Sequence, residues 1–142
     1  MEARSIRVPA NGFTLVELLV VLAILGLLVA LAAPRVMSYL GGARADTARI
    51  QIEKLSSVLD LYQLDLGRYP TAQEGLRALV EKPSDASKWN GPYLRNSESL
   101  LDPWGAPYIY RAPGQHGEFD LLSLGADGKE GGEGADRDVT SW

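Results

Sequence analysis

The chain contains no cysteine, which excludes disulfide bonds and thiolate metal sites. This absence does not identify the compartment in which the protein folds. A small domain outside the cytoplasm that lacks disulfides needs another stabilising element, such as a bound metal ion. The 142 residues suffice for one modest domain and one further element.

Positive charge is also scarce. Lysine and arginine number 14 against 18 acidic residues, which leaves a net charge of −4 and a pI near 5.0. Proteins that bind nucleic acids present a basic surface to the phosphate backbone. We therefore expect no nucleic-acid partner.

The usual signatures of catalysis are missing from the sequence. The single histidine, His116, lies in an expected hairpin turn, and no G-x-S-x-G motif frames a serine nucleophile. Pairs of acidic residues can hydrolyse glycosides, but here the acids crowd one glycine-rich segment instead of lining a pocket. We expect a protein that is not an enzyme.

One long apolar run is present near the N-terminus. Residues 13–33 read FTLVELLVVLAILGLLVALAA, carry a single charge at Glu17, and are long enough to cross a bilayer as a helix. A short leader with Arg4 and Arg7 precedes the run and ends in small residues at Gly12. In a secretory signal the cleavage site follows the apolar region, whereas here it precedes it. Cleavage after Gly12 would leave the hydrophobic helix on the mature protein.

The carboxylate of Glu17 requires an explanation. A charge inside an apolar helix costs a few kcal/mol and usually has a partner. No lysine or arginine lies within one helical turn of it. Two interpretations remain open at this point. The carboxylate either meets the α-amine that cleavage would create on Phe13 of a neighbouring subunit, or it lies shallow enough to reach headgroups and water.

The orientation of this segment in a membrane is ambiguous from charge alone. Arg4 and Arg7 precede the run, but Arg35, Arg44 and Arg49 follow it closely. Because positive residues mark the cytoplasmic side, the two ends compete.

A second, amphipathic half of the helix follows the apolar run. Its apolar residues recur every three or four positions, which is typical of one buried helix face. We predict one helix over residues 13–66, weakened either at Pro34 or at Gly41-Gly42 and stopped by Gly67. The apolar stripe consists of Ala48, Ile52, Leu55, Leu59, Tyr62 and Leu66.

The remaining segments predict a small α+β domain. Thr71 and Glu74 have capping-box spacing, so a short helix is expected to continue to Val80. Two strands are predicted over 107–111 and 118–124, joined by a turn, and we expect their antiparallel sheet to pack on the long helix. The loop between the short helix and the first strand has apolar anchors at Trp89, Tyr93, Leu94, Leu100, Leu101 and Trp104.

An acidic, glycine-rich tail closes the chain. Residues 125–138, GADGKEGGEGADRD, contain five acids, two bases and five glycines. Such a backbone is costly to order, and its carboxylates repel one another. Calcium, which takes roughly six to eight oxygen ligands, would relieve both penalties, whereas the alternative is a solvated loop. The segment is neither an EF-hand, because Lys129 replaces an expected acid, nor a phosphate loop, because Glu130 follows Gly128-Lys129.

The hexapeptide from Gly12 to Glu17, GFTLVE, resembles the type III signal of type IV pilins and type II secretion pseudopilins. This resemblance implies that a prepilin peptidase cuts between Gly12 and Phe13 and N-methylates Phe13. It implies that Glu17 supports subunit registration during assembly. It also implies three regions: a cleaved leader over 1–12, a transmembrane and assembly helix over 13–33, and a periplasmic domain over 34–142. The protein would then be a single-pass protein of the bacterial inner membrane.

Longer segments, including YPTAQEGLRALV, DPWGAPYIY and PGQHGEFDLLSLGADG, resemble the major pseudopilins of type II secretion. The resemblance implies a type IV pilin-like fold with a calcium-binding C-terminal loop. It implies Asp127, Asp136 and Asp138 as side-chain ligands, with backbone carbonyls near Leu124 and Val139. Type IVa major pilins commonly hold this region with a disulfide, so the lack of cysteine favours a pseudopilin.

The same resemblance implies a structural function. The chain would polymerise into a pseudopilus that drives folded proteins across the outer membrane. Its partners would be other copies, minor pseudopilins, an inner-membrane platform protein, an assembly ATPase and an outer-membrane secretin. A passive anchored binding domain is the alternative, but it explains neither Gly12 ahead of the apolar run nor Glu17 without a partner.

Overall fold

The computed structural model describes residues 12–142. The rest of the expected leader, residues 1–11, lies outside the described residues. The chain forms two compact units that divide between Val36 and Met37. Helix α1 comprises Leu15–Leu66, and three short 3-10 helices and three strands follow it.

Helix α1 continues through both of the predicted weak points. Pro34 lies inside it, and the helix also runs through Gly41 and Gly42, so neither position ends it. It stops at Gly67, whose φ of 75° is left-handed and whose N–H donates to the Gln63 carbonyl oxygen at 2.7 Å. The predicted long helix is therefore confirmed almost residue for residue.

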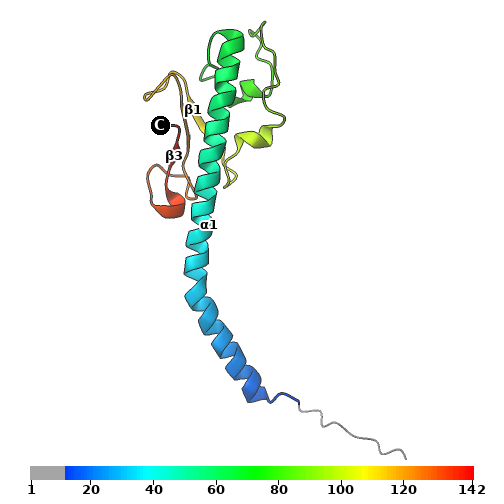
Figure 1. Cartoon of the computed structure of the whole chain (residues 1–142), viewed down its shortest axis with the longest axis vertical. Coiled ribbons are helices and arrows are strands. Elements are labelled where there is room, and N and C mark those ends of the chain that lie inside the picture. Colours follow the sequence, from blue (N-terminus) through cyan, green and yellow to red (C-terminus); the bar gives the residue numbers. More distant parts are fainter. Residues whose placement is uncertain (1–11) are drawn as a thin grey trace, which may run out of the picture. The chain divides into compact units, whose positions relative to one another are not determined.

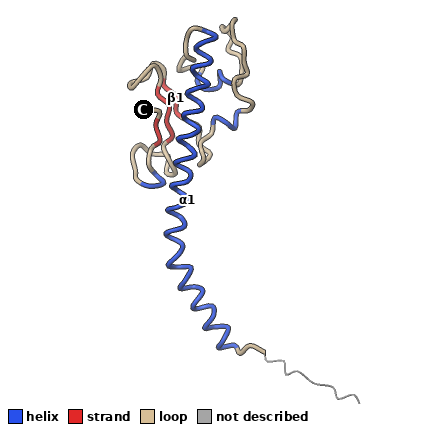
Figure 2. The backbone as a smooth tube through the Cα atoms, in the orientation of Figure 1, coloured by secondary structure: helices blue, strands red, loops and turns tan. Residues whose placement is uncertain are grey.

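The second half of α1 carries the core of the domain. Figures 1 and 2 show the strands against one side of this half and the segment 67–107 against the other. The predicted apolar stripe faces this interior, and only Leu66 at its end is merely half-buried. The buried members of the stripe are Ala48, Ile52, Leu55, Leu59 and Tyr62.

The sheet is antiparallel with strand order β1-β2-β3. Strands β1 (Ile109–Arg111) and β2 (Asp120–Ser123) confirm the predicted hairpin. Strand β3 (Val139–Thr140) was not predicted, because two residues are too few to show alternation. All four residues of β2 are buried, so β2 is the centre of the sheet. The predicted α+β class is confirmed.

The segment between α1 and the sheet is irregular but well anchored. The expected short helix is a 3-10 helix, η1 (Gly75–Leu79), and a second, η2 (Ser97–Leu100), follows. The aromatic side chains of Trp89 and Tyr93 pack on the core, and the Trp89 indole donates to the Ala78 carbonyl at 2.9 Å. Leu101 was wrongly expected among the anchors, because its side chain is 40% exposed.

Gly41 is where the C-terminal tail contacts α1. The 3-10 helix η3 (Gly134–Asp136) lies against it, and a Cβ atom added at Gly41 would fall 2.5 Å from the Ala135 Cβ. Gly42, the next residue, is exposed and has no such neighbour. Glycine at position 41 therefore permits a close approach between loop and helix, whereas glycine at 42 only weakens the helix.

This difference gives a matched pair of variants. Gly41→Ala should lower the free energy of unfolding by about 1 kcal/mol or more, because the methyl group overpacks the contact with Ala135. Gly42→Ala should raise it by up to about 1 kcal/mol, because alanine is the better helix former. Thermal unfolding of the whole chain in detergent micelles, followed by near-UV circular dichroism, measures both. Equal stabilisation by the two variants would show that η3 does not press on the helix.

Candidate functional site

The N-terminus of α1 is capped by Thr14. Its side-chain oxygen accepts the Glu17 N–H at 3.2 Å, and its carbonyl accepts the Leu18 N–H at 3.1 Å. Thr14 and Glu17 thus occupy the N-cap and N3 positions, and the sequence analysis missed this spacing, which is the same as that of Thr71 and Glu74. The Glu17 carboxylate lies in the first turn, where the helix dipole favours a negative charge. Within residues 12–142 it forms no ion pair.

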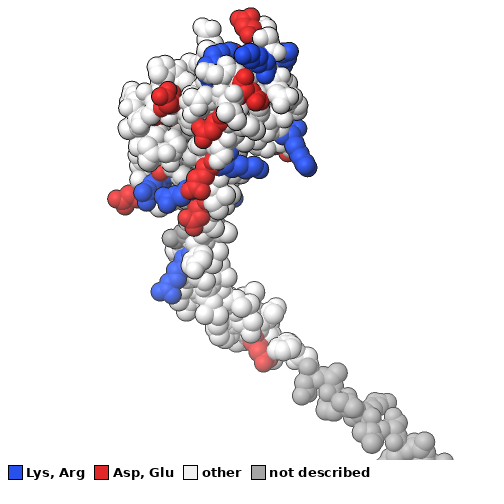
Figure 3. Space-filling view, turned by 45° about the horizontal axis from the view of Figure 1, so that its top comes forward, with Lys and Arg blue, Asp and Glu red and all other residues white. Residues whose placement is uncertain are grey.

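The apolar part of α1 is exposed on all sides. Phe13 is 80% exposed, and an 18-residue window of the helix has a mean hydropathy of 3.0 with no residue buried. By length and composition this helix is able to cross a membrane. Figure 3 shows charged side chains gathered on the domain and few along this stretch. Such a surface requires lipid or other protein around it.

The C-terminal loop folds back on itself. The Ala126 N–H donates to the Ala135 carbonyl at 3.0 Å, which joins its two limbs. Gly125 has a φ of 68°, and a Cβ atom there would lie 2.8 Å from the Asp136 carbonyl oxygen. A Cβ atom at Gly132 would lie 2.5 Å from the same oxygen. Both glycines are required because the chain passes so close to Asp136.

The predicted calcium ligands are near one another in the chain but are not gathered into a cluster. Asp127 accepts the Lys129 N–H at 3.1 Å, and Asp138 accepts the Gly131 N–H at 2.9 Å through Oδ2. Asp127 and Asp136 are exposed. Among the described residues, no three acidic, histidine or cysteine side chains are arranged to hold a metal ion.

One atom of the loop nevertheless fits a cation. Oδ1 of Asp138 is buried and has no hydrogen-bond partner within the described part of the chain. A buried carboxylate oxygen without a donor is costly, and a metal ion is one way to satisfy it. Ser123 pairs with Val139 across β2 and β3, so Leu124 and Val139 lie at the same end of the sheet. The oxygens that this part of the loop offers are those of carboxylates and backbone carbonyls, which calcium prefers.

His116 lies in the turn before β2, as predicted, and has a structural role. Its ring stacks on Trp142 with centroids 4.0 Å apart, and Nδ1 lies 3.2 Å from Oδ2 of Asp120. Burial disfavours ionisation of Asp120, but the hydrogen bonds from the Gln115 and His116 amides, aided by the His116 side chain, outweigh it and lower its pKa. The carboxylate thus holds the turn, and the histidine joins it to the C-terminal residues.

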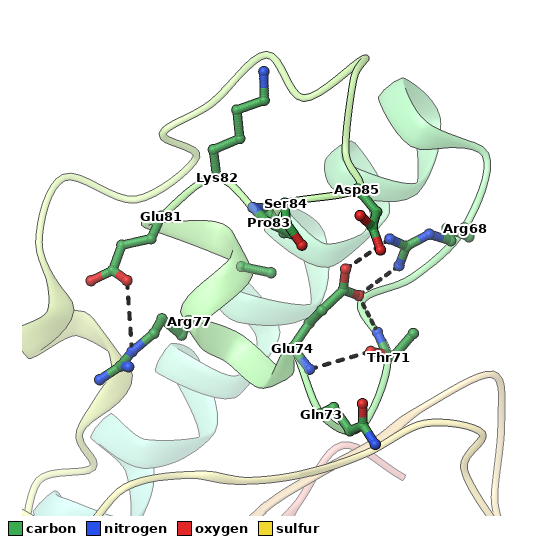
Figure 4. A pocket seen from close by; sticks show the side chains of 11 residues that line it. Arg68, Thr71, Gln73, Glu74, Arg77, Glu81, Lys82, Pro83, Ser84 and Asp85 are labelled. Atoms are coloured by element: carbon green, nitrogen blue, oxygen red, sulfur yellow. Dashed lines mark hydrogen bonds and ion pairs between the residues drawn. The ribbon is translucent and has the colours of Figure 1, made fainter.

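A shallow groove beside η1 is the other notable surface (Figure 4). Four of its charged side chains are paired within the protein, Arg68 with Glu74 and Arg77 with Glu81. Arg68 binds both carboxylate oxygens of Glu74, at 2.6 and 2.8 Å, and Glu74 also accepts the Thr71 N–H at 2.7 Å. The Glu74 N–H donates to the Thr71 hydroxyl oxygen at 3.2 Å, so the predicted capping box is confirmed. The guanidinium lowers the pKa of Glu74 to about 2, although burial opposes this shift.

Comparison with known proteins identifies two matching families. Residues 35–142 match the family described as type II secretion system (T2SS), protein G. Residues 9–33 match the prokaryotic N-terminal methylation motif. Together the two matches cover both the domain and the apolar helix.

Individual relatives agree with these families. The chain is 48% identical to the type II secretion system core protein G of Pseudomonas aeruginosa, over 93% of this chain and 94% of the relative. It is 42% identical to the core protein G of Vibrio cholerae, over 93% and 91%. Its structure resembles the crystal structure of the major pseudopilin from the type 2 secretion system of enterohaemorrhagic Escherichia coli. That match has a TM-score of 0.63 and 35% identity, over 75% of this chain and 92% of the other.

The Glu74 ion pair predicts a pH dependence of stability. The folded pKa lies near 2, below the ordinary value of 4.5, so the ionised carboxylate stabilises the fold fully above pH 4.5. This contribution, about 1 kcal/mol after allowance for solvent screening, is lost as the pH falls toward 2. Glu74→Gln should therefore be less stable at neutral pH and should lose stability less steeply on acidification.

Glu81→Gln is the control for this variant. Glu81 forms an exposed pair with Arg77 at 3.9 Å, which should contribute little. Thermal melts between pH 7 and pH 2.5 give the melting temperature as a function of pH for the wild type and both variants, and the slopes of these curves are compared. A Glu74→Gln curve parallel to the wild type would contradict the assigned shift.

Proposed function

Because this chain belongs to the family of type II secretion system core protein G, the major pseudopilins, we propose that it polymerises into a pseudopilus. Its homologues are structural subunits, and the chain is not an enzyme. Before assembly, α1 would anchor it in the inner membrane with residues 34–142 in the periplasm. The exposed apolar helix supports this placement, because it is long enough to cross the bilayer.

Processing would precede assembly. The match to the methylation motif covers residues 9–33 and includes the Gly12–Phe13 bond. A prepilin peptidase would remove residues 1–12 and methylate the new N-terminus at Phe13. Phe13 is followed immediately by the Thr14 cap, so the new amine would lie directly before the first turn of α1.

The observation that carries the assembly proposal is the environment of Glu17. Its carboxylate belongs to the N-terminal part of α1, which is apolar and exposed, and residues 12–142 supply no ion pair for it. In a filament, the amine of Phe13 on a neighbouring copy would neutralise it as the helices pack together. Without that partner, a buried carboxylate in the helix bundle would cost several kcal/mol.

The proposed pseudopilus would push folded proteins across the outer membrane. Minor pseudopilins, the inner-membrane platform protein, the assembly ATPase and the outer-membrane secretin would be its partners, and nucleic acid would not. This part of the proposal rests on family membership, since major pseudopilins are parts of the secretion system.

We also propose that the C-terminal loop binds one calcium ion. Asp127, Asp136 and Asp138 would hold it, with carbonyls near Leu124 and Val139. The unpaired Oδ1 of Asp138 supports this proposal, because it lacks a donor in the described chain. Bound calcium would neutralise the acidic loop and supply the stabilisation that a domain without disulfides needs.

Glu17→Ala tests the assembly role. The variant should still be cleaved after Gly12, because the scissile bond is unchanged, but it should form far fewer filaments, because the carboxylate no longer attracts a neighbour's amine. Intact mass and methylation of Phe13 report processing, and sheared-filament yield reports assembly. Gly12→Val is the complementary variant and should remain an unprocessed precursor. A normal filament yield from Glu17→Ala would refute the role of Glu17, and cleaved Gly12→Val would refute the cleavage site.

A calcium titration tests the loop. In detergent micelles, millimolar calcium should raise the melting temperature of the processed chain by several degrees over a chelator, since a ligand at about 100 times its Kd adds roughly 2.7 kcal/mol. Asp138→Asn should lose most of this rise. Asp85→Asn, which removes an equal charge outside the loop, should keep it. A wild type that does not respond to calcium would remove the metal from the proposal and leave the assembly role intact.

A further inference from the structure

A second buried carboxylate lies outside the acidic loop. Asp102 is only 6% exposed. All of the groups that donate hydrogen bonds to its carboxylate are neutral. Oδ1 accepts the N–H groups of Trp104 and Ala106 at 3.0 and 2.9 Å. Oδ2 accepts the hydroxyl of Ser123 at 2.5 Å. Within the described residues no basic side chain pairs with it. Burying a carboxylate without a basic partner costs free energy, so the presence of Asp102 at this position requires an explanation.

The hydroxyl of Ser123 connects this carboxylate by hydrogen bonds to Gly125, at the start of the C-terminal loop. Ser123 is the last residue of β2 and is 1% exposed. An ionised carboxylate can only accept hydrogen bonds, so the Ser123 proton must point to Asp102. The lone pairs of the same oxygen then receive the N–H of Gly125 at 3.3 Å. Gly125, Ser123 and Asp102 thus form a relay, a chain of two hydrogen bonds in which Gly125 donates to Ser123 and Ser123 donates to Asp102.

This relay orients the carbonyl of Leu124. The Leu124 carbonyl and the Gly125 N–H belong to one planar trans peptide, and in such a unit the two groups point in opposite directions. Since the N–H is directed to Ser123, the carbonyl is directed away from it. The same peptide lies against the other limb of the loop, because a Cβ atom at Gly125 would be 2.8 Å from the Asp136 carbonyl carbon.

We propose that Asp102 and Ser123 are positioning residues for a divalent-cation site in the C-terminal loop. They would hold the Leu124 carbonyl in the orientation of a ligand before the ion arrives. The inference rests on the proposed calcium binding, and it assigns a role to residues outside the acidic loop. Fixing this peptide in advance reduces the conformational entropy that binding must overcome, as other outer-shell groups do at metal sites.

Ser123→Ala and Ser141→Ala form a matched pair of variants. Each removes a hydroxyl whose oxygen accepts a backbone N–H, from Gly125 in one case and from Leu121, at 3.1 Å, in the other. Only Ser123 is linked to Asp102 and to the loop. Isothermal titration with calcium chloride, on the processed chain in micelles, should show a Kd about 10-fold weaker for Ser123→Ala. Ser141→Ala should stay within about twofold of the wild type.

Asp102→Asn keeps the contact with Ser123 but reverses the direction of its hydrogen bond. The amide can keep an oxygen toward the Trp104 and Ala106 N–H groups while its NH₂ faces Ser123. The serine oxygen then accepts from the amide, and its proton competes with the Gly125 N–H. This variant keeps the turn at 102–106 and should still weaken calcium binding. Luminescence decay of bound Eu³⁺ in H₂O and D₂O should report an additional coordinated water in both Asp102→Asn and Ser123→Ala, because a displaced carbonyl leaves room for one.

The outcomes separate the two proposals. If the wild type binds no calcium, the proposed metal site is wrong and the positioning role falls with it. If the wild type binds and the affinity and hydration of Ser123→Ala and Asp102→Asn match those of Ser141→Ala, the metal site stands and the positioning role is refuted. An equal loss of affinity in Ser141→Ala would also refute it, since general destabilisation would then explain the effect.

Discussion

The domain depends on one contact, the burial of a single apolar stripe on the second half of α1. The strands are only three, four and two residues long, too short to form a stable sheet alone. They are held because the stripe covers their inner face. Tyrosines then attach the irregular segments to the polar edges of the same helix. Tyr108 donates to Gln51 at 2.6 Å, and Tyr93 donates to Asp65 at 2.8 Å.

The two halves of α1 have different surfaces because they serve different environments. In the domain the helix is apolar on one face and polar on the other, which suits burial under a sheet in water. Toward its N-terminus it is apolar all round, which suits lipid and the helices of other subunits. Glu17 is the exception to that apolar surface, and its position in the first turn places the carboxylate where the helix dipole favours a negative charge.

The features that the sequence could predict are those with a repeating pattern or a local sequence signature. The stripe repeats through several turns, and both the Gly67 stop and the Thr71–Glu74 capping box have local signatures. The features that it could not predict depend on contacts between distant segments. Strand β3 exists only because β2 lies beside it, and the exposure of Leu101 depends on how its loop packs. The relay from Asp102 to Gly125 joins residues whose types carry no motif. Calcium binding by the acidic tail stays a prediction, and the composition of the tail did not specify how its carboxylates are arranged.

The way the C-terminal loop is closed has a consequence for its length. Pairing of β2 with β3, together with the hydrogen bond between Ala126 and Ala135, fixes the base of the loop independently of its tip. The entropic cost of a longer tip grows slowly, by only about 0.6 kcal/mol for each doubling. Insertions between Gly128 and Glu130, ahead of the contacts of Gly131 with Asp138 and of Gly132 with Asp136, would therefore leave the domain folded. This part of the tip is a natural place to display a peptide tag or a fluorescent label on the protein surface.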